Sequence, residues 1–385
     1  MPRRLELAAE EPERLLNDLN TSTDEFLCRA LRGESSPWSA LNAGTSPEEF
    51  LQRCQHHGIS SLLYHAMQEQ EEWQNWPPDL RNELEETSKG DIAQEMLRAH
   101  YLKKLLKGFS DLGVPCLLTK GEALANTLYP TPGTRTRCDS DLFIPIEGIS
   151  KARQAVADAG FAIVSPLYKS HQFTVRRGGE TPDVFEFDVH WRILNAPRYA
   201  RTLSFDETWG HSIEVPGMES VRTLDVVDTL LLACMHRAGS DGHDPDRLIW
   251  IYDIHLLVTA MAPEQWLAFA DKAVTLNVQT PCLDGLNTSR ACLGTVLPSD
   301  AMNKLSSAEM PRTLSRRYAH SNLGLLIDDW KRLPDSQARR ELLRELFLPN
   351  AESLLHKYHK EERWWLPLLY LRHVFGGLTQ RLTLR

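Results

Sequence analysis

The stretch CLLTKGEALANTLYPTPGTRTRCDSDLFIPI, residues 116–146, decides the fold of this chain. It opens with a short apolar run that stops at Lys120 and Gly121 and then continues as a helix-like segment. A loop rich in Pro, Gly, Thr and Arg follows, and a second apolar run begins with two aspartates, Asp139 and Asp141. Two short strands that flank a helix are typical of an α+β unit. Two like charges at the mouth of a strand raise the question of what they bind.

The residues that follow this stretch extend the same unit. An amphipathic helix is predicted over residues 148–160, closed by a glycine, and a strand over 161–165. The segment FEFDVHWRI, residues 185–193, alternates as a strand does. One of its faces carries Phe185, Phe187, Val189 and Trp191, and the other carries Glu186, Asp188 and His190. We therefore predict a small mixed sheet with α+β order.

Both flanks of this unit have helical patterns. The segment that begins at Ser46 has a good N-cap and first turn, and Gly58 interrupts it. Residues 91–113 predict an amphipathic helix, and residues 225–239 and 246–261 predict two strongly apolar ones. The expected apolar stripe of the 91–113 helix is Ile92, Met96, Ala99, Leu102, Leu106 and Phe109. We expect a further helix near the end, over residues 361–382.

These patterns divide the chain into three predicted parts. The parts are an N-terminal helical region over 1–111, an α/β core over 112–215 and a C-terminal helical domain over 216–385. The fold class is thus α+β, with a small mixed-sheet core between two helical regions.

Composition excludes several classes of protein. The 385 residues carry a net charge of −9, so no broad basic surface for long nucleic acid is expected. Seven scattered cysteines without a CxxC pair favour a reducing compartment over a disulfide framework. The N-terminal segment is charged and lacks the apolar core of a signal peptide, and no apolar run is long enough to span a membrane. We expect a cytoplasmic protein without membrane partners.

Asp139 and Asp141 are the first candidates for chemistry. In a strand both side chains leave the same face, and carboxylates that close repel one another unless a cation lies between them. Magnesium is a common cation for such a site. If the strand of Asp188 pairs beside them, three carboxylates converge, the minimum for two magnesium ions in a phosphoryl displacement. The alternative is that the aspartates cap a solvated loop and that Glu186 and Asp188 mark a half-solvated sheet face.

Basic residues around the first strand could bind phosphate. The Lys120–Gly121 turn would bring backbone amides and an ammonium close to an anion. Arg135 and Arg137 could bind phosphate oxygens in a bidentate manner, although solvated loop arginines explain them equally well.

The order of these residues resembles the family of uncharacterised bacterial nucleotidyltransferases, within the polymerase-beta-like nucleotidyltransferase superfamily. The resemblance is carried by K-G-x-A-L-A-x-x-L-Y-P-x-P-G-x-R-x-x-x-D-x-D-L, then an amphipathic helix, then D-x-H-W. The matching residues are Lys120, Gly121, Tyr129, Arg135, Asp139, Asp141, Asp188, His190 and Trp191, and more loosely His236 and Asp253. The chain departs from the superfamily in having KGEA in place of a Gly-Ser turn, and Ser140 in place of an apolar residue.

The resemblance implies a magnesium-dependent enzyme, with Mn²⁺ as a substitute ion, that moves an NMP from an NTP such as ATP to an acceptor. It implies that Asp139, Asp141 and Asp188 are catalytic and hold the metal. It places Lys120, Gly121, Arg135, Arg137 and His190 at the nucleotide. The acidic charge favours a small-molecule or protein acceptor. His236 and Asp253 are equally compatible with structural roles.

Two other functions compete with this one. A non-catalytic binding or scaffold protein on a decayed core is supported by the missing Gly-Ser pair. A D-x-D glycosyltransferase would need a nucleotide-binding α/β half before the aspartates, where this chain has helical patterns.

Overall fold

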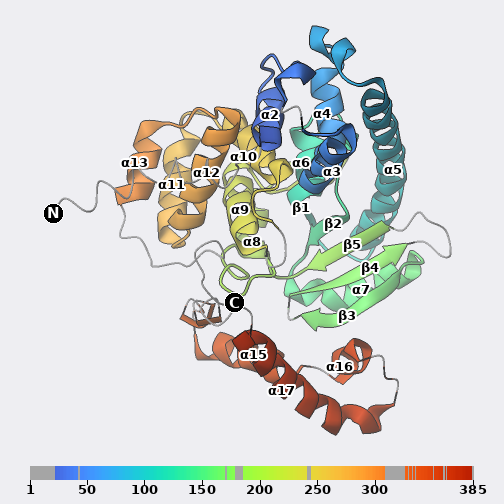
Figure 1. The fold of residues 1–385 in the computed structure, drawn as a ribbon. Coiled ribbons are helices and arrows are strands. Elements are labelled where there is room, and N and C mark those ends of the chain that lie inside the picture. The colour runs from blue at the N-terminus through green and yellow to red at the C-terminus, as the bar shows by residue number, and fades with distance from the viewer. Residues whose placement is uncertain are drawn as a thin grey trace.

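A computed structural model describes residues 22–41, 44–169, 171–177, 185–240, 244–307 and 326–383, the last range without 328, 332, 334, 350, 359 and 361. Within these ranges the chain forms α-helices around a single mixed sheet of seven strands (Figure 1). The predicted α+β class, with helical regions before and after the sheet, is confirmed.

In the described residues, four α-helices precede the first strand. They are α2 (Ser22–Leu31), α3 (Pro47–His57), α4 (Ser60–Met67) and α5 (Pro78–Asp111). The predicted start at Ser46 is confirmed, because its side chain accepts a hydrogen bond from the Glu49 amide and the Glu49 carboxylate accepts one from the Ser46 amide. Gly58, at φ +68°, ends α3 in the left-handed conformation that glycine adopts most easily.

The apolar stripe predicted for α5 is wrong in its first half. Ile92 and Met96 are 43% and 72% exposed, whereas Leu102 and Phe109 are fully buried. The helix also begins at Pro78, well before the predicted start. Helical periodicity identifies the apolar face of a helix but not the length over which another element covers that face. In this protein α7 and the sheet cover the C-terminal half of α5.

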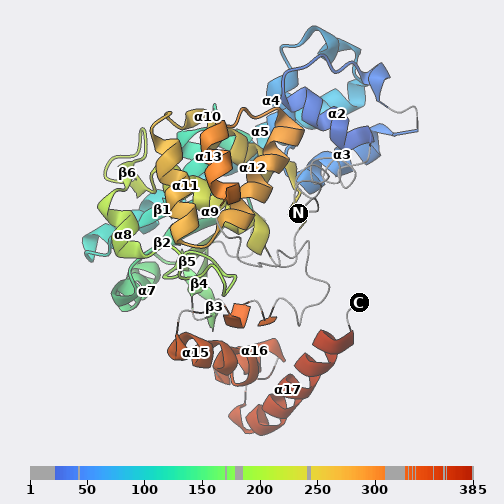
Figure 2. The same cartoon turned by 90° about the vertical axis from the view of Figure 1, so that its left-hand side faces the viewer.

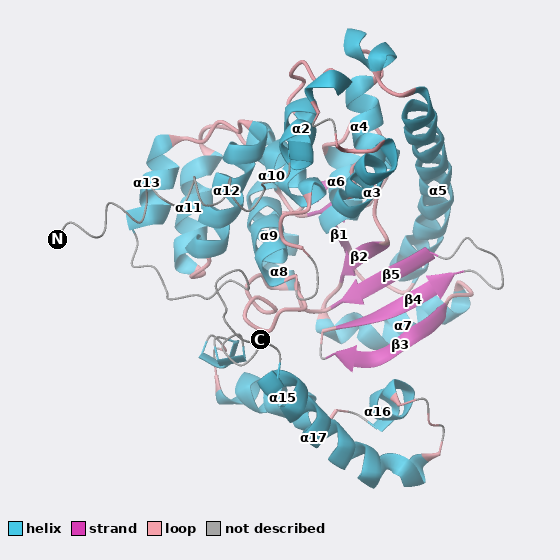
Figure 3. Cartoon of the chain, viewed as in Figure 1, coloured by secondary structure: helices cyan, strands magenta, loops and turns pink. Residues whose placement is uncertain are grey.

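The sheet has the strand order β3-β4-β5-β2-β1-β7-β6. Its strands are β1 (Leu117–Thr119), β2 (Asp139–Phe143), β3 (Ala162–Lys169), β4 (Gln172–Arg177), β5 (Phe185–His190), β6 (Ile213–Glu214) and β7 (Arg222–Thr223). Figure 3 shows β3, β4 and β5 as a long-stranded half of the sheet beside the shorter β2 and β1. Strand β5 runs parallel to β2 and antiparallel to β4.

The two faces of the sheet have different roles. Phe185, Phe187 and Val189 are buried on one face against α5 and α7 (Ile149–Asp158). Glu186 and Asp188 leave the other face and are half-buried. The predicted alternation of this strand is therefore confirmed. The helix α6 (Lys120–Thr127) directly follows β1 and packs beside β2.

A second and larger core joins helices from both ends of the sequence. Its C-terminal members are α9 (Val226–Gly239), α10 (Leu248–Ala260), α11 (Gln265–Thr275), α12 (Gln279–Leu293) and α13 (Ser299–Ser307), preceded by the short α8 (Phe205–Gly210). Phe26 and Phe50 from the N-terminal helices belong to the same cluster as Leu286 from α12. The exact division into parts at residues 111 and 215 stays a prediction.

The last described helices form a separate group. They are α15 (Ser336–Phe347), α16 (Ala351–Lys357) and α17 (Leu366–Thr383), which contain two small apolar clusters of their own. Figure 2 shows them together at one end of the molecule, beyond β3. Among the described helices, none combines the length and the apolar character that crossing a membrane would require.

Candidate active site

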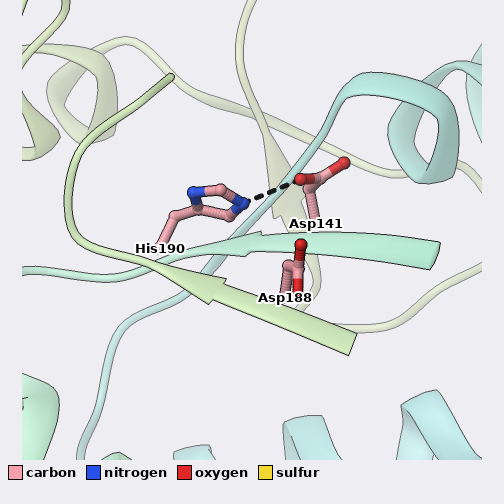
Figure 4. Close-up of side chains that lie close together, drawn as sticks. All are labelled: Asp141, Asp188 and His190. Carbon is pink, nitrogen blue, oxygen red and sulfur yellow. Dashed lines mark hydrogen bonds and ion pairs between the residues drawn. The ribbon is translucent and has the colours of Figure 1, made fainter. Parts of the chain in front are cut away.

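The pairing of β2 with β5 brings the carboxylates together. Asp139 lies opposite Glu186, and Asp141 lies opposite Asp188. The prediction that the strand of Asp188 pairs beside the two aspartates is therefore confirmed. Since alternate residues of a strand share a face, these side chains leave the sheet on the same side. One ligand atom from each of Asp141, Asp188 and His190 lies within 4.8 Å of the others (Figure 4).

Asp141 is held by two cation-capable groups. Lys120 Nζ lies 2.5 Å and His190 Nε2 2.8 Å from the same oxygen, Oδ1. Burial opposes ionisation of this carboxyl, but the charge of Lys120 and the hydrogen bond from His190 outweigh it and hold the pKa of Asp141 well below its usual range. The His190 ring therefore carries a proton on Nε2, and its buried Nδ1 has no hydrogen-bond partner among the described residues.

Asp188 is oriented by the neighbouring strand β4. Thr174 Oγ1 donates to Oδ1 at 2.5 Å, and Gln172 Nε2 donates to Oδ2 at 2.7 Å. Both carboxylate oxygens thus have neutral donors. Sequence reasoning missed Gln172 and Thr174 because it did not predict β4. Their spacing of two residues, with Phe173 between them, was the signal that they share a face.

Asp139, the first residue of β2, differs from its neighbour. It is exposed, yet the protein packed around its carboxyl and the repulsion from Asp141 raise its pKa to about 6. Lys120 partly offsets this repulsion.

The turn from β1 into α6 carries Lys120 and Gly121. Lys120 has φ +52°, a left-handed conformation that is uncommon for a residue with a side chain. A Cβ on Gly121 would lie 3.3 Å from Nη2 of Arg135, so a larger residue would push against that guanidinium. The glycine expected to approach an anion is therefore also required for packing.

Arg135 is engaged by a buried carboxylate. Its Nε and Nη2 donate to Asp253 at 2.8 and 2.7 Å, and Tyr129 donates to Asp253 at 2.7 Å. All three residues are buried. Asp253, which the sequence left compatible with a structural role, forms an ion pair with Arg135. Arg135 thus connects the loop before β2 to α10.

Arg137 also has carboxylate partners. Its Nη2 lies 2.6 Å from Glu95 and its Nε donates to Glu122 at 3.0 Å. Ser140, which stands in place of the apolar residue of the superfamily, is buried and donates to the same Glu122 at 2.5 Å. This network joins α5, α6 and β2, and Glu95 was not identified from the sequence.

His236, which the sequence left open between a structural role and substrate contact, packs its ring edge-on against Trp250, with ring centres 5.0 Å apart.

The donor set fits a small, oxygen-preferring divalent ion. Its oxygens come from carboxylates, and the imidazole of His190 faces Asp141 rather than completing a nitrogen-rich set. The geometry can therefore support magnesium-assisted chemistry on phosphates better than zinc chemistry.

A protein-family model described as an uncharacterised nucleotidyltransferase matches residues 43–294. The match includes every strand of the sheet and ends directly after α12. No curated protein matches the chain.

Proposed function

Because the chain belongs to the family of uncharacterised nucleotidyltransferases, we propose that it transfers an NMP from an NTP to an acceptor and releases pyrophosphate. The observation that carries this proposal is the parallel register of β2 and β5, which brings Asp141 beside Asp188 with Asp139 on the same face. A carboxylate pair on one strand and a third carboxylate on its parallel neighbour also support assignment to the polymerase-beta-like superfamily.

In this proposal Asp139, Asp141 and Asp188 would hold Mg²⁺, or Mn²⁺ in its place. Such an ion, when bound, neutralises phosphate oxygens and stabilises the charge that develops during displacement. His190 would act through Asp141, whose Oδ1 it fixes at 2.8 Å. The protein would thus hold the carboxylates in place before the nucleotide arrives.

Asp188 is the carboxylate that we assign to the acceptor. An acceptor hydroxyl oxygen would form a bond to the α-phosphorus while the bond from that phosphorus to the oxygen shared with the β-phosphate breaks. Pyrophosphate would leave with the electron pair, and the hydroxyl proton would pass to Asp188. Gln172 and Thr174 would keep this carboxylate aimed at the reaction.

The triphosphate would lie at the start of α6, where Gly121 and the first amides of the helix can approach an anion. We do not assign Arg135 or Arg137 to the phosphates, because both guanidiniums already pair with carboxylates. They would instead fix the loop before β2. The helices that follow the sheet would provide the acceptor's side. The net charge of −9 favours a small-molecule or protein acceptor over long nucleic acid.

A nucleotide-binding scaffold is the second candidate, and the missing Gly-Ser pair favours it. The opposing observation is that the site keeps Asp139 near Asp141 and Asp188, where burial and the repulsion from these carboxylates raise the pKa of Asp139 to about 6. A protein without catalysis or metal binding has no physical need for such repulsion.

Release of pyrophosphate from each of the four NTPs, in the presence of Mg²⁺ and a panel of hydroxyl-bearing small molecules and proteins, tests the proposal. We expect one NTP to yield pyrophosphate and Asp188→Asn to abolish the reaction. The matched control is Glu186→Gln, two residues away on the same strand face, whose carboxylate pairs with Arg176. Release of inorganic phosphate instead of pyrophosphate would contradict NMP transfer.

A further inference from the structure

We infer that Lys120 takes the place of one of the two metal ions at this site, so that a single divalent ion is bound together with the nucleotide. The inference rests on the proposed function and concerns how its carboxylates are neutralised.

The position of the ammonium is the first observation. Lys120 Nζ lies 2.5 Å from Asp141 Oδ1, and the two side chains are only 12% and 8% exposed. Burial disfavours the charged amine, but Asp141 outweighs that effect and raises the pKa of Lys120, with smaller contributions from Asp139 and Asp188. The ammonium is thus a cation in direct contact with Asp141, at the carboxylates where a metal ion would be expected to bind.

The backbone supports this position. Thr119 pairs with Asp141 across β1 and β2, so the next residue along the chain is well placed to reach that carboxylate. Lys120 adopts φ +52°, where glycine would be favoured, while the glycine comes one residue later. A lysine held in an unfavourable conformation at the carboxylates indicates that its side chain is required there.

The remaining ligand atoms are few. Both oxygens of Asp188 accept hydrogen bonds from Gln172 and Thr174, and Oδ1 of Asp141 accepts two. Oδ2 of Asp141, which points away from His190 in Figure 4, and the carboxylate of Asp139 would then be the principal ligands, and Asp188 would add an oxygen through a lone pair that its hydrogen bonds leave unused. These carboxylate ligands suit one magnesium ion that keeps its other positions for water and phosphate oxygens.

The charges of the site also indicate one divalent ion. Counting the protein groups alone, before the charge of the triphosphate is added, three carboxylates and one ammonium leave two negative charges, which one divalent ion balances. An ammonium has three donors and no fixed coordination geometry. Lys120 can therefore stay on Asp141 and also contact a phosphate oxygen of the bound nucleotide, as its position in the turn before α6 allows.

Counting bound ions tests the inference without any activity assay. Mn²⁺ would be titrated, by electron paramagnetic resonance, into the full chain saturated with α,β-methylene-ATP. We expect one Mn²⁺ per chain for the wild type and two for Lys120→Met. Lys107→Met, which removes an exposed lysine from α5, is the matched control and should bind one. Lys120→Arg, which keeps a cation and is the milder change for folding, should also bind one.

Two Mn²⁺ ions in the wild type, or no additional ion in a folded Lys120→Met variant, would overturn the inference. Titration of Mn²⁺ without nucleotide distinguishes a failure of this inference from a failure of the proposed function. An ion site that appears in Lys120→Met, in a protein that binds no nucleotide, would support the inference while the proposed function fails. The absence of any Mn²⁺ site in both proteins would overturn both.

Discussion

Asp139 and Asp141 leave the same face of β2, but their surroundings drive their acidities apart. Lys120 and His190 stabilise the charge of Asp141, whereas Asp139 experiences the repulsion of that charge. Pairs of carboxyl groups with separated pKa values are typical of functional sites.

Asp139→Asn should therefore stabilise the metal-free protein. The pKa of Asp139 is about 6 in the fold and 3.8 in an unfolded chain, so between these values the folded state binds the additional proton. The wild type then loses stability as the pH rises from about 4 to 6, and it does not regain this stability above about pH 6. Allowing for solvent screening, we expect the Tm of Asp139→Asn to exceed that of the wild type by about 2 °C at pH 7.5, with no difference below about pH 4.

Thermal unfolding followed by circular dichroism across this pH range measures the difference. Glu147→Gln, which removes an exposed charge outside the site, is the control. If the Tm of Asp139→Asn exceeds that of the wild type by the same amount at pH 3.5, the effect is not electrostatic.

Thr174 allows an isosteric test of how Asp188 is held. Thr174→Val removes the hydroxyl that donates to Asp188 at 2.5 Å, while Thr174→Ser retains it. Loss of a hydrogen bond to a metal-ligating carboxylate commonly reduces metal affinity or activity by about 10–100-fold. We expect such a loss of Mg²⁺-dependent NTP affinity for Thr174→Val and near wild-type affinity for Thr174→Ser, by calorimetry. Equal affinities for the two variants would contradict this role.

At the residue scale, the sequence predicts only what local geometry determines. The two-residue period of a strand was sufficient to place Asp139 with Asp141 and Asp188 with His190. The partner of Arg135 was not predictable in this way, because Asp253 lies 118 residues further along the chain. An arginine beside a candidate phosphate site has the same sequence pattern whether it binds a phosphate or a buried carboxylate.

The Arg135–Asp253 pair joins two elements, the loop that leads into β2 and the helix α10. Both side chains are 6% exposed. Removing one partner of a buried ion pair leaves an uncompensated charge and typically costs about 3–5 kcal/mol. We expect a loss of this size in the free energy of unfolding of Arg135→Met, measured by urea denaturation.

The double variant Arg135→Met/Asp253→Asn should recover part of that loss, because it leaves no unpaired charge beside Tyr129. If the two single losses simply add in the double variant, the two side chains are not energetically coupled and the connection described here is incorrect.

At the element scale, a strand is predicted where its pattern is strong. FEFDVH alternates without exception, and β5 spans it. QFTVRR has the same length, but only Phe173 and Val175 are apolar and its outward residues are a mixture of Gln, Thr and Arg, so β4 was missed. The two hydrogen bonds that orient Asp188 therefore could not be derived, because both donors lie on β4 and depend on its pairing with β5.

At the scale of the whole molecule, the N-terminal and C-terminal helices share one core although the sheet separates them in sequence. Phe26, Leu27 and Phe50, which are at most 3% exposed, belong to this core. The sequence identified both helical regions but could not show that they pack together, since amphipathic patterns do not specify a partner.

We expect truncation of the N-terminal helices and truncation of the last helices to affect stability differently. A chain that begins at residue 78 would lose several buried large side chains, each worth about 2–5 kcal/mol, against a total stability of about 5–15 kcal/mol. It should not unfold cooperatively.

A chain that ends at residue 307 keeps the core and loses helices with separate clusters, together with the Arg198–Asp329 ion pair. Calorimetry should show one transition for it, at a lower Tm; the opposite pattern would contradict the shared core.

The proposed function requires Asp139 and Asp141 to bind a nucleotide through magnesium. Calorimetric titration of each NTP into the wild type and into Asp139→Asn/Asp141→Asn, with and without Mg²⁺, measures this binding. We expect at least one NTP to bind in a manner that requires Mg²⁺ and is lost in the double variant. Binding that is unaffected by Mg²⁺ or by the double substitution, or no binding to a folded wild type, would contradict it.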